Sequence, residues 1–258
     1  MMSMRWFFVG NFLVLAGLMI FAAVSCEKQE PAASQNSTST PGTVASTGAT
    51  NNSPDSPASA GGMVELKIEL PSPRFQGTPR NIKEENMEPA NIKFDPIMAP
   101  AGAINLAQGK KVTASDTMPI MGELVQITDG DKEALDGNFV EFMQGTQWVQ
   151  VDLEQECPIY AVGVWHNHSA GRVFHDVIIQ LSNDKDFLND VTTIYNNDYD
   201  NSSKLGVGAD LQYVDSYKGK IADAKGTKAR YVRFYSNGSS DSDANQYTEV
   251  EVWGVPAK

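Results

Sequence analysis

The stretch that decides the fold reads Trp148-Val149-Gln150-Val151-Asp152-Leu153. Its apolar and polar side chains alternate, which is the two-residue period of a strand with one buried face. Similar short strand-like segments recur at residues 177–181, 231–235 and 249–253, with Gly, Asn and Asp between them. The pattern predicts an all-β sandwich over residues 104–258.

Other architectures and partners are disfavoured by the rest of the pattern. No long stretch of residues 104–258 has the 3.6-residue period of a helix, which argues against a parallel α/β sheet with a nucleotide crevice. The 258-residue chain has 20 Lys and Arg against 32 Asp and Glu, a net charge of −12. We therefore expect no nucleic-acid partner, because phosphate binding needs an excess of positive charge.

Six segments of this region follow one another in the order of a known family. They are residues 105–115, 128–130, 147–153, 177–184, 229–233 and 249–254. The region 104–258 thereby resembles the discoidin domain, also called the coagulation factor V/VIII C-type domain, whose bacterial members are similar to family 32 carbohydrate-binding modules. The resemblance implies a galactose-binding-like jelly roll. The paired terminal cysteines of vertebrate members are missing, so we expect Cys157 to be a buried or half-buried free thiol.

An acidic turn at residues 129–133 is a candidate cation site. Hard cations prefer several oxygen ligands supplied by flexible loops. In the resembled family a structural calcium ion is held by the aspartate of the Asp-Gly pair, by loop carbonyls and by the glutamate that opens the final strand. The resemblance implies Asp129 and Glu249 as calcium ligands, with Asp131 as an extra ligand. A solvated acidic turn without an ion is the alternative.

Residues 165–175 contain all three histidines of the chain, His166, His168 and His175. If residues 169–172 connect a hairpin, strand alternation places the three imidazoles on one face. Three histidines could hold zinc, but no carboxylate stands in a recognisable motif as a base, which disfavours zinc catalysis. Sugar recognition, a structural or adventitious metal, and histidines that bind nothing remain open.

Sugar recognition suits this cluster because hydroxyl pairs need planar donors and acceptors in fixed positions beside an apolar face. The resembled family uses His, Asn, Arg and an aromatic residue from loops at one end of the sandwich, and Asn167 and Arg172 lie where its pattern carries ligand contacts. The predicted ligand-binding residues are His166, Asn167, His168, Arg172, His175 and Tyr199. Tyr195, Phe139 and Phe142 are the other loop-adjacent aromatic candidates.

The N-terminal residues 1–25 carry a positive charge at Arg5 followed by an apolar run, which indicates an export signal or a membrane helix. The run Ala23-Val24-Ser25-Cys26 resembles the lipobox of bacterial lipoproteins. The resemblance implies that residues 1–25 are a signal peptide and that Cys26 becomes diacylated, so that the membrane is contacted through the lipid anchor only. In enterobacterial lipoproteins, an aspartate directly after the cysteine signals retention in the inner membrane. This chain has Glu27 at that position, so the resemblance implies that the protein is located at the outer membrane of the cell envelope.

Two segments lie between the signal peptide and the sandwich. Residues 26–62 are dominated by Ser, Thr, Pro, Ala, Gly and Asn, which predicts a disordered tether. Residues 63–103 are expected to form an extended arm with one strand, because apolar and charged residues alternate over 64–70 before Pro71.

Together these features predict a lipid-anchored, non-catalytic module that binds carbohydrate through loops of a calcium-stabilised sandwich. A protein–protein or matrix adhesion domain without a glycan pocket is the alternative. An enzyme is disfavoured, because no serine, cysteine or carboxylate pair stands in a recognisable catalytic setting. Residues 236–245 have no hydrophobic period and are expected to form a mobile, solvent-exposed loop before the last strand, with a calcium or ligand role as the alternative.

Overall fold

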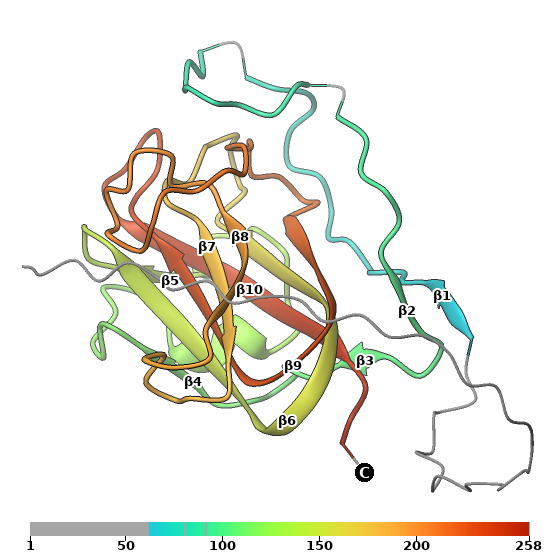
Figure 1. Cartoon of the computed structure of the whole chain (residues 1–258). Coiled ribbons are helices and arrows are strands. Elements are labelled where there is room, and N and C mark those ends of the chain that lie inside the picture. The colour runs from blue at the N-terminus through green and yellow to red at the C-terminus, as the bar shows by residue number, and fades with distance from the viewer. Residues whose placement is uncertain (1–61, 80, 91, 258) are drawn as a thin grey trace, which may run out of the picture. The chain divides into compact units, whose positions relative to one another are not determined.

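The computed structural model describes residues 62–79, 81–90 and 92–257 (Figure 1). Within these residues the regular elements are β-strands, apart from one short 3-10 helix, η1 (Leu124–Thr128). In the described part of the chain, no helix is long and apolar enough to cross a membrane. The predicted all-β fold is confirmed. The predicted signal peptide and the lipidation site Cys26 lie outside the described residues, as does the predicted tether except for Gly62.

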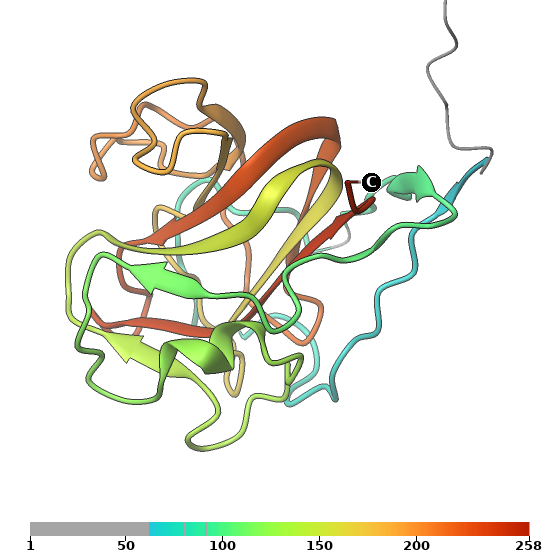
Figure 2. The same cartoon turned by 90° about the horizontal axis from the view of Figure 1, so that it is seen from below.

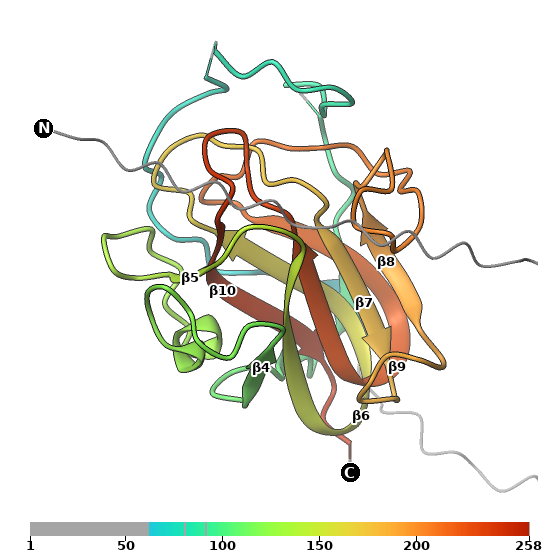
Figure 3. The same cartoon turned by 90° about the vertical axis from the view of Figure 1, so that its left-hand side faces the viewer.

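Eight antiparallel strands form the main sheet. They are β3 (Ile104–Asn105), β4 (Val112–Ala114), β5 (Val140–Phe142), β6 (Gln147–His166), β7 (Ile178–Ser182), β8 (Thr192–Asn196), β9 (Lys220–Ser236) and β10 (Asn245–Gly254). The strand order is β3-β10-β6-β9-β7-β8, with β4 beside β6 and β5 beside β10. Figure 3 shows η1 next to β4 and β5, with which it is in contact.

The two longest strands, β6 and β9, run through both layers into which this sheet folds. Residues 147–152 of β6 pair with β4 and with residues 231–236 of β9, whereas residues 157–166 pair with β10 and with residues 220–229 of β9. The register shifts between the two halves, where Glu154 has a positive φ of 70°. Such a bulge bends a strand, and Figure 2 shows both strands curving from one layer into the other.

The core lies between the layers and contains the residues that the alternation predicts. Val149 and Val151 of the first half of β6 are fully buried, and they belong to the same apolar cluster as Val164 of its second half and Val252 of β10. Cys157 is a buried free thiol, as expected. Burial of apolar area contributes about 25 cal/mol per Å², so this cluster is the main stabilising element of the fold.

The arm is built differently from the expectation of one half-buried strand over residues 64–70. It holds two short strands, β1 (Met63–Glu65) and β2 (Met98–Pro100), which pair only with each other. All three residues of β1 are exposed, whereas Ala99 of β2 is buried and β2 contacts β6. The segment between β1 and β2 runs along the domain and contacts its loops (Figure 1).

Candidate functional site

His166, the last residue of β6, is fully buried and belongs to the interior. Its Nδ1 lies 3.2 Å from Asp215 Oδ2, and its backbone N–H donates to the same oxygen at 2.9 Å. The ring stacks on Phe174 with 4.3 Å between centroids. This environment gives His166 a packing role and leaves it no surface to offer a ligand.

The other two histidines lie in different environments. His168 is fully buried, with Nε2 2.9 Å from the carbonyl oxygen of Lys132. His175 is half-buried, with Nε2 3.6 Å from Glu84 Oε2, which is longer than a hydrogen bond. The three imidazoles therefore do not form a shared solvent-facing surface.

The hairpin considered for residues 169–172 does not form. Arg172 forms an isolated bridge with Asp215, and Phe174 forms one with Ser239. These residues pair with segments distant in sequence because β6 is already flanked by β9 and β10 up to its last residues. The alternation of residues 165–175 could not reveal that β9 and β10 already occupy both edges of β6.

Asn167 and Arg172 lie in contact with each other. Arg172 Nη1 donates to the carbonyl oxygen of Asn167 at 2.8 Å, and its Nε donates to Asp241 Oδ2 at 3.0 Å. The Asn167 amide donates to Gln246 Oε1 at 3.1 Å. The guanidinium therefore joins the loop after β6 to the loop between β9 and β10.

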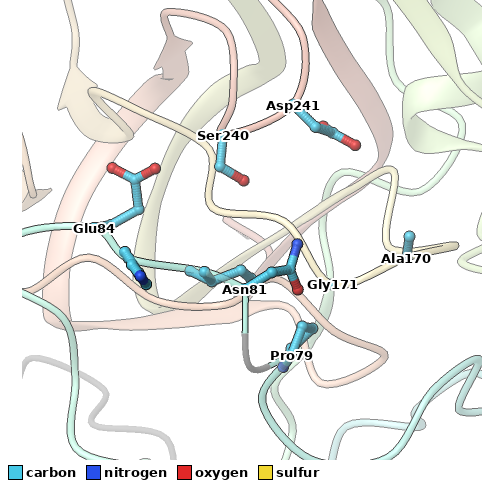
Figure 4. Close-up of a pocket in the computed structure, with 9 residues that line it drawn as sticks. Pro79, Asn81, Glu84, Ala170, Gly171, Ser240 and Asp241 are labelled. Carbon is cyan, nitrogen blue, oxygen red and sulfur yellow. The ribbon is translucent and has the colours of Figure 1, made fainter.

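A cavity of about 420 Å³ lies beside this junction, within the size range of small-molecule sites. Three segments line it: the arm, the loop after β6, and the loop between β9 and β10. The residues labelled in Figure 4 are Pro79, Asn81, Glu84, Ala170, Gly171, Ser240 and Asp241. In that view Ser240 and Asp241 lie across the cavity from Asn81. Residues with amide, hydroxyl and carboxylate groups thus line a space that the proline ring also borders.

The aromatic candidates do not line this cavity. Tyr199 is exposed, and Tyr195, Phe139 and Phe142 are buried. The residues that sequence reasoning missed are those of the arm and of residues 240–241. The arm lies outside the region that carries the family resemblance, and residues 240–241 fall in a stretch expected to be solvent-exposed.

That stretch, residues 236–245, is exposed only in part. Ser236 and Asn245 are fully buried, and Ser236 Oγ donates to Asn245 Oδ1 at 2.7 Å. The Val173 N–H donates to Ser240 Oγ at 3.1 Å. The prediction of solvent exposure is therefore wrong for the two ends, which form part of the interior, and correct for residues 240–243.

The predicted cation ligands Asp129 and Glu249 lie at one place. Glu249 is fully buried; its Oε1 accepts from the Gly130 N–H at 3.2 Å, and its Oε2 has no partner among the described residues. Burial raises the pKa of Glu249 to about 9, and the charge of Asp129 adds to the rise. A buried carboxylate oxygen without a partner beside a second carboxylate fits a hard cation. Asp131 is exposed and accepts from the Glu133 N–H at 2.9 Å.

A second acidic group was not predicted. Carboxylate oxygens of Asp176, Asp198 and Asp200 lie within 4.8 Å of one another, so the three could hold a metal ion. Burial is the main cause that raises the pKa of Asp176 above its ordinary range. The signal was available in the sequence, since Asp176 precedes β7 and the other two follow β8, and the antiparallel pairing of β7 with β8 brings these ends together.

Solved structures similar to this chain include carbohydrate-binding modules of the galactose-binding-like, discoidin type. The family 32 module of AlyQ, in complex with 4,5-unsaturated mannuronic acid, is 22% identical, with 55% of this chain and 92% of that chain covered and a TM-score of 0.40. SpX-3, a fucose-binding module of Streptococcus pneumoniae, is 18% identical over 60% of this chain and 99% of its own, with a TM-score of 0.42.

A family 89 glycoside hydrolase of Clostridium perfringens, in complex with GlcNAc-α-1,4-galactose, is also similar over part of its length. It is 18% identical over 60% of this chain but only 16% of its own, with a TM-score of 0.43. No protein-family model matches the sequence, and no curated protein matches it.

Proposed function

We propose that this chain is a non-catalytic carbohydrate-binding module. The observation that carries the proposal is the cavity of about 420 Å³ beside Arg172, which polar residues from three segments line. Sugar rings need hydrogen-bonding groups fixed in position beside an apolar surface. The carboxylate of Asp241 is fixed by its ion pair with Arg172 at 3.0 Å, and the Pro79 ring supplies apolar surface. The motifs that resemble the discoidin domain support the same conclusion.

A glycan array tests this function. We expect the full-length protein to bind one class of sugar, and Arg172→Ala to lose that binding because Asp241 then lacks its partner. Asp243→Asn is the matched control, since Asp243 is exposed in the same loop and does not line the cavity. A blank array for the wild type would contradict carbohydrate binding and favour the adhesion alternative.

We also propose that calcium binds between Asp129 and Glu249. The unpartnered Oε2 of Glu249 supports this site, because a buried carboxylate oxygen without a partner is destabilising and a divalent cation would offset that cost. Calcium is expected to raise the melting temperature of the wild-type protein and to leave that of Glu249→Gln unchanged. Equal melting temperatures of the wild type with calcium and with chelator would count against the site. Glu251→Gln is the control, because it removes the neighbouring carboxylate and keeps that of Glu249.

Lipid anchoring in the outer membrane is the third part of the proposal, and it rests on the lipobox-like sequence that ends at Cys26. Mass spectrometry of the N-terminal peptide is expected to show a diacylated cysteine, and Cys26→Ala is expected to move the protein from the membrane fraction to the soluble fraction. An unmodified Cys26 in membrane-bound protein would overturn it.

A further inference from the structure

The two-stranded ribbon of the arm has an unpaired edge. β1 pairs with β2 on one side and, within the described residues, with no strand on its other side. β2 contacts β6 of the sandwich, and Figure 1 shows β1 on the side of the ribbon away from it. The outer edge of β1 is therefore accessible to another strand.

The hydrogen bonds between β1 and β2 determine which backbone groups point outward. The Leu66 N–H donates to the carbonyl oxygen of Ile97 at 2.8 Å. Backbone groups alternate in direction along an antiparallel strand, so Leu66 faces β2, whereas Glu65 and Lys67 face outward. Among the described residues, the outward N–H and C=O groups of Glu65 and Lys67 have no hydrogen-bond partner.

The opposite edge of the ribbon is protected by prolines. Met98 lies opposite Glu65, so its backbone groups, and those of residues 96 and 100, face away from β1. Residues 96 and 100 are Pro96 and Pro100, which have no N–H to donate. Proline is a common means of protecting an exposed edge strand against pairing. The outer edge of β1 has no proline before Pro71, so it keeps the donors that the β2 edge lacks.

The sequence along the outer edge of β1 is complementary to itself in one antiparallel register. In a ladder centred at Leu66, Glu65 lies opposite Lys67 of a second copy, and Lys67 lies opposite its Glu65. Outward-facing residues then meet outward-facing residues, and two pairs of opposite charges form. A ladder centred at Glu65 or at Lys67 would place like charges opposite each other. A ladder centred at Ile68 would place Pro71 opposite Glu65 and lose a hydrogen bond there.

The register centred at Leu66 also joins the apolar faces of the two copies. Val64 lies opposite Ile68 of the second copy, and Leu66 lies opposite its own equivalent. Val64 is 46% exposed, and Leu66 and Ile68 are half-buried, whereas Lys67 is exposed, so the two-residue alternation continues beyond β1. Pairing would remove apolar surface of these three side chains from water, which is favourable.

We propose that the outer edge of β1 is a self-association surface whose partner is a second copy of this chain. Two chains pair in antiparallel orientation through residues 64–68, centred at Leu66, and form a four-stranded sheet in the order β2-β1-β1-β2. The contact is two-fold symmetric, as in most homodimers. Because interfaces well below about 1,200 Å² belong to weak complexes, we expect a dissociation constant on the order of 10 to 100 µM.

Sedimentation equilibrium of the full chain tests this pairing by charge reversal. The chain carries Cys26→Ala, so that the proposed lipid anchor does not cause association. This protein is expected to dimerise between about 1 µM and about 1 mM, a range that includes weak complexes. Glu65→Lys and Lys67→Glu should each weaken the dimer about tenfold, because each change turns both pairs of opposite charges into like-charge pairs. Lys93→Glu, at an exposed arm lysine outside this edge, is the control and should dimerise normally.

An equimolar mixture of the two charge-reversed variants separates pairing from misfolding. One chain then carries two acidic residues and the other two basic residues at positions 65 and 67, so a heterodimer regains both attractive pairs. The mixture should associate about as tightly as the unreversed chain. A protein that stays monomeric over the whole range, or a mixture that associates no more tightly than its components, would overturn the proposal. A Glu65→Lys dimer as tight as the unreversed one would also overturn it, because Glu65 would then not face Lys67.

Discussion

At the scale of single residues, this protein keeps several ionisable groups where water cannot reach them. Asp176 is 7% exposed and lies near the carboxylates of Asp198 and Asp200. Ser202 Oγ and the Asn237 amide donate to its Oδ2, but burial outweighs these hydrogen bonds and raises its pKa. A buried charge beside like charges is a cost that the rest of the fold must offset.

Asp176→Asn is therefore expected to stabilise the protein at neutral pH. The folded wild type binds this proton more tightly than the unfolded chain, so its stability falls as pH rises from the ordinary value of 3.8 through the raised pKa. The asparagine variant does not lose stability in this way as pH rises, because no charge is buried. Its Oδ1 can still accept hydrogen bonds from Ser202 and Asn237.

Thermal unfolding at pH 4 and at pH 7.5, in chelator, measures the effect. The variant should have a higher melting temperature than the wild type at pH 7.5 and a smaller difference at pH 4. Asp186→Asn, an exposed aspartate outside the cluster, is the control. A variant that is equally destabilised at both pH values would contradict the prediction.

The residues of the candidate site were only partly predictable, for a physical reason. Asn167 and Arg172, which the sequence motif places in one short segment, contact each other beside the cavity but do not line it. His166 and His168 were predicted to bind a ligand, with packed histidines as an alternative, and both are fully buried. Segments such as residues 215 and 239 pair with this loop from far along the chain. The sequence of residues 165–175 alone does not predict pairing with such distant segments.

At the scale of elements, the core strands were predictable and their lengths were not. The stretch 148–153 lies inside β6, which extends from Gln147 to His166. The second half was missed because three consecutive exposed residues, 154–156, interrupt the alternation, although the strand continues through a bulge. Buried apolar alternation thus indicates where a strand is, while bulges decide how far it continues.

The arm is attached to the sandwich by a lysine held among aromatic rings. Lys220 Nζ contacts the Glu88 carboxylate of the arm and lies 4.7 to 5.1 Å from the ring centroids of Tyr195, Tyr213 and Phe94. Both members of the ion pair are largely buried. Removing one charge of such a pair leaves the other without compensation, which costs about 3 to 5 kcal/mol.

Lys220→Met is expected to lower the free energy of unfolding by about 3 kcal/mol and to make the arm more susceptible to proteolysis. Adding Glu88→Gln should recover part of the loss, because no unpaired charge then remains. Lys218→Met, an exposed lysine two residues earlier, is the control. Denaturant unfolding and limited proteolysis measure both effects, and a double variant less stable than Lys220→Met would contradict this account.

At the scale of the whole molecule, net charge and domain composition constrain the partners. The charge of −12 repels polyanionic glycans at a distance. The arm and the sandwich belong to one compact unit of the chain. The compact unit that the contacts define is therefore longer than residues 104–258, the region that carries the family resemblance.

This difference between the resembling region and the contact-defined unit leads to a prediction about truncation. Residues 63–258 are expected to unfold in a single transition, and residues 104–258 alone to melt about 4 to 8 °C lower, which for a domain of this size corresponds to about 2 kcal/mol. Without the arm, Lys220 loses Glu88 and Phe94 and keeps its charge beside two tyrosine rings. Lys220→Met should consequently stabilise the truncated protein, although it destabilises the longer one. Equal melting temperatures for the two lengths, or the same sign for Lys220→Met in both, would show that the arm is not part of the folded unit.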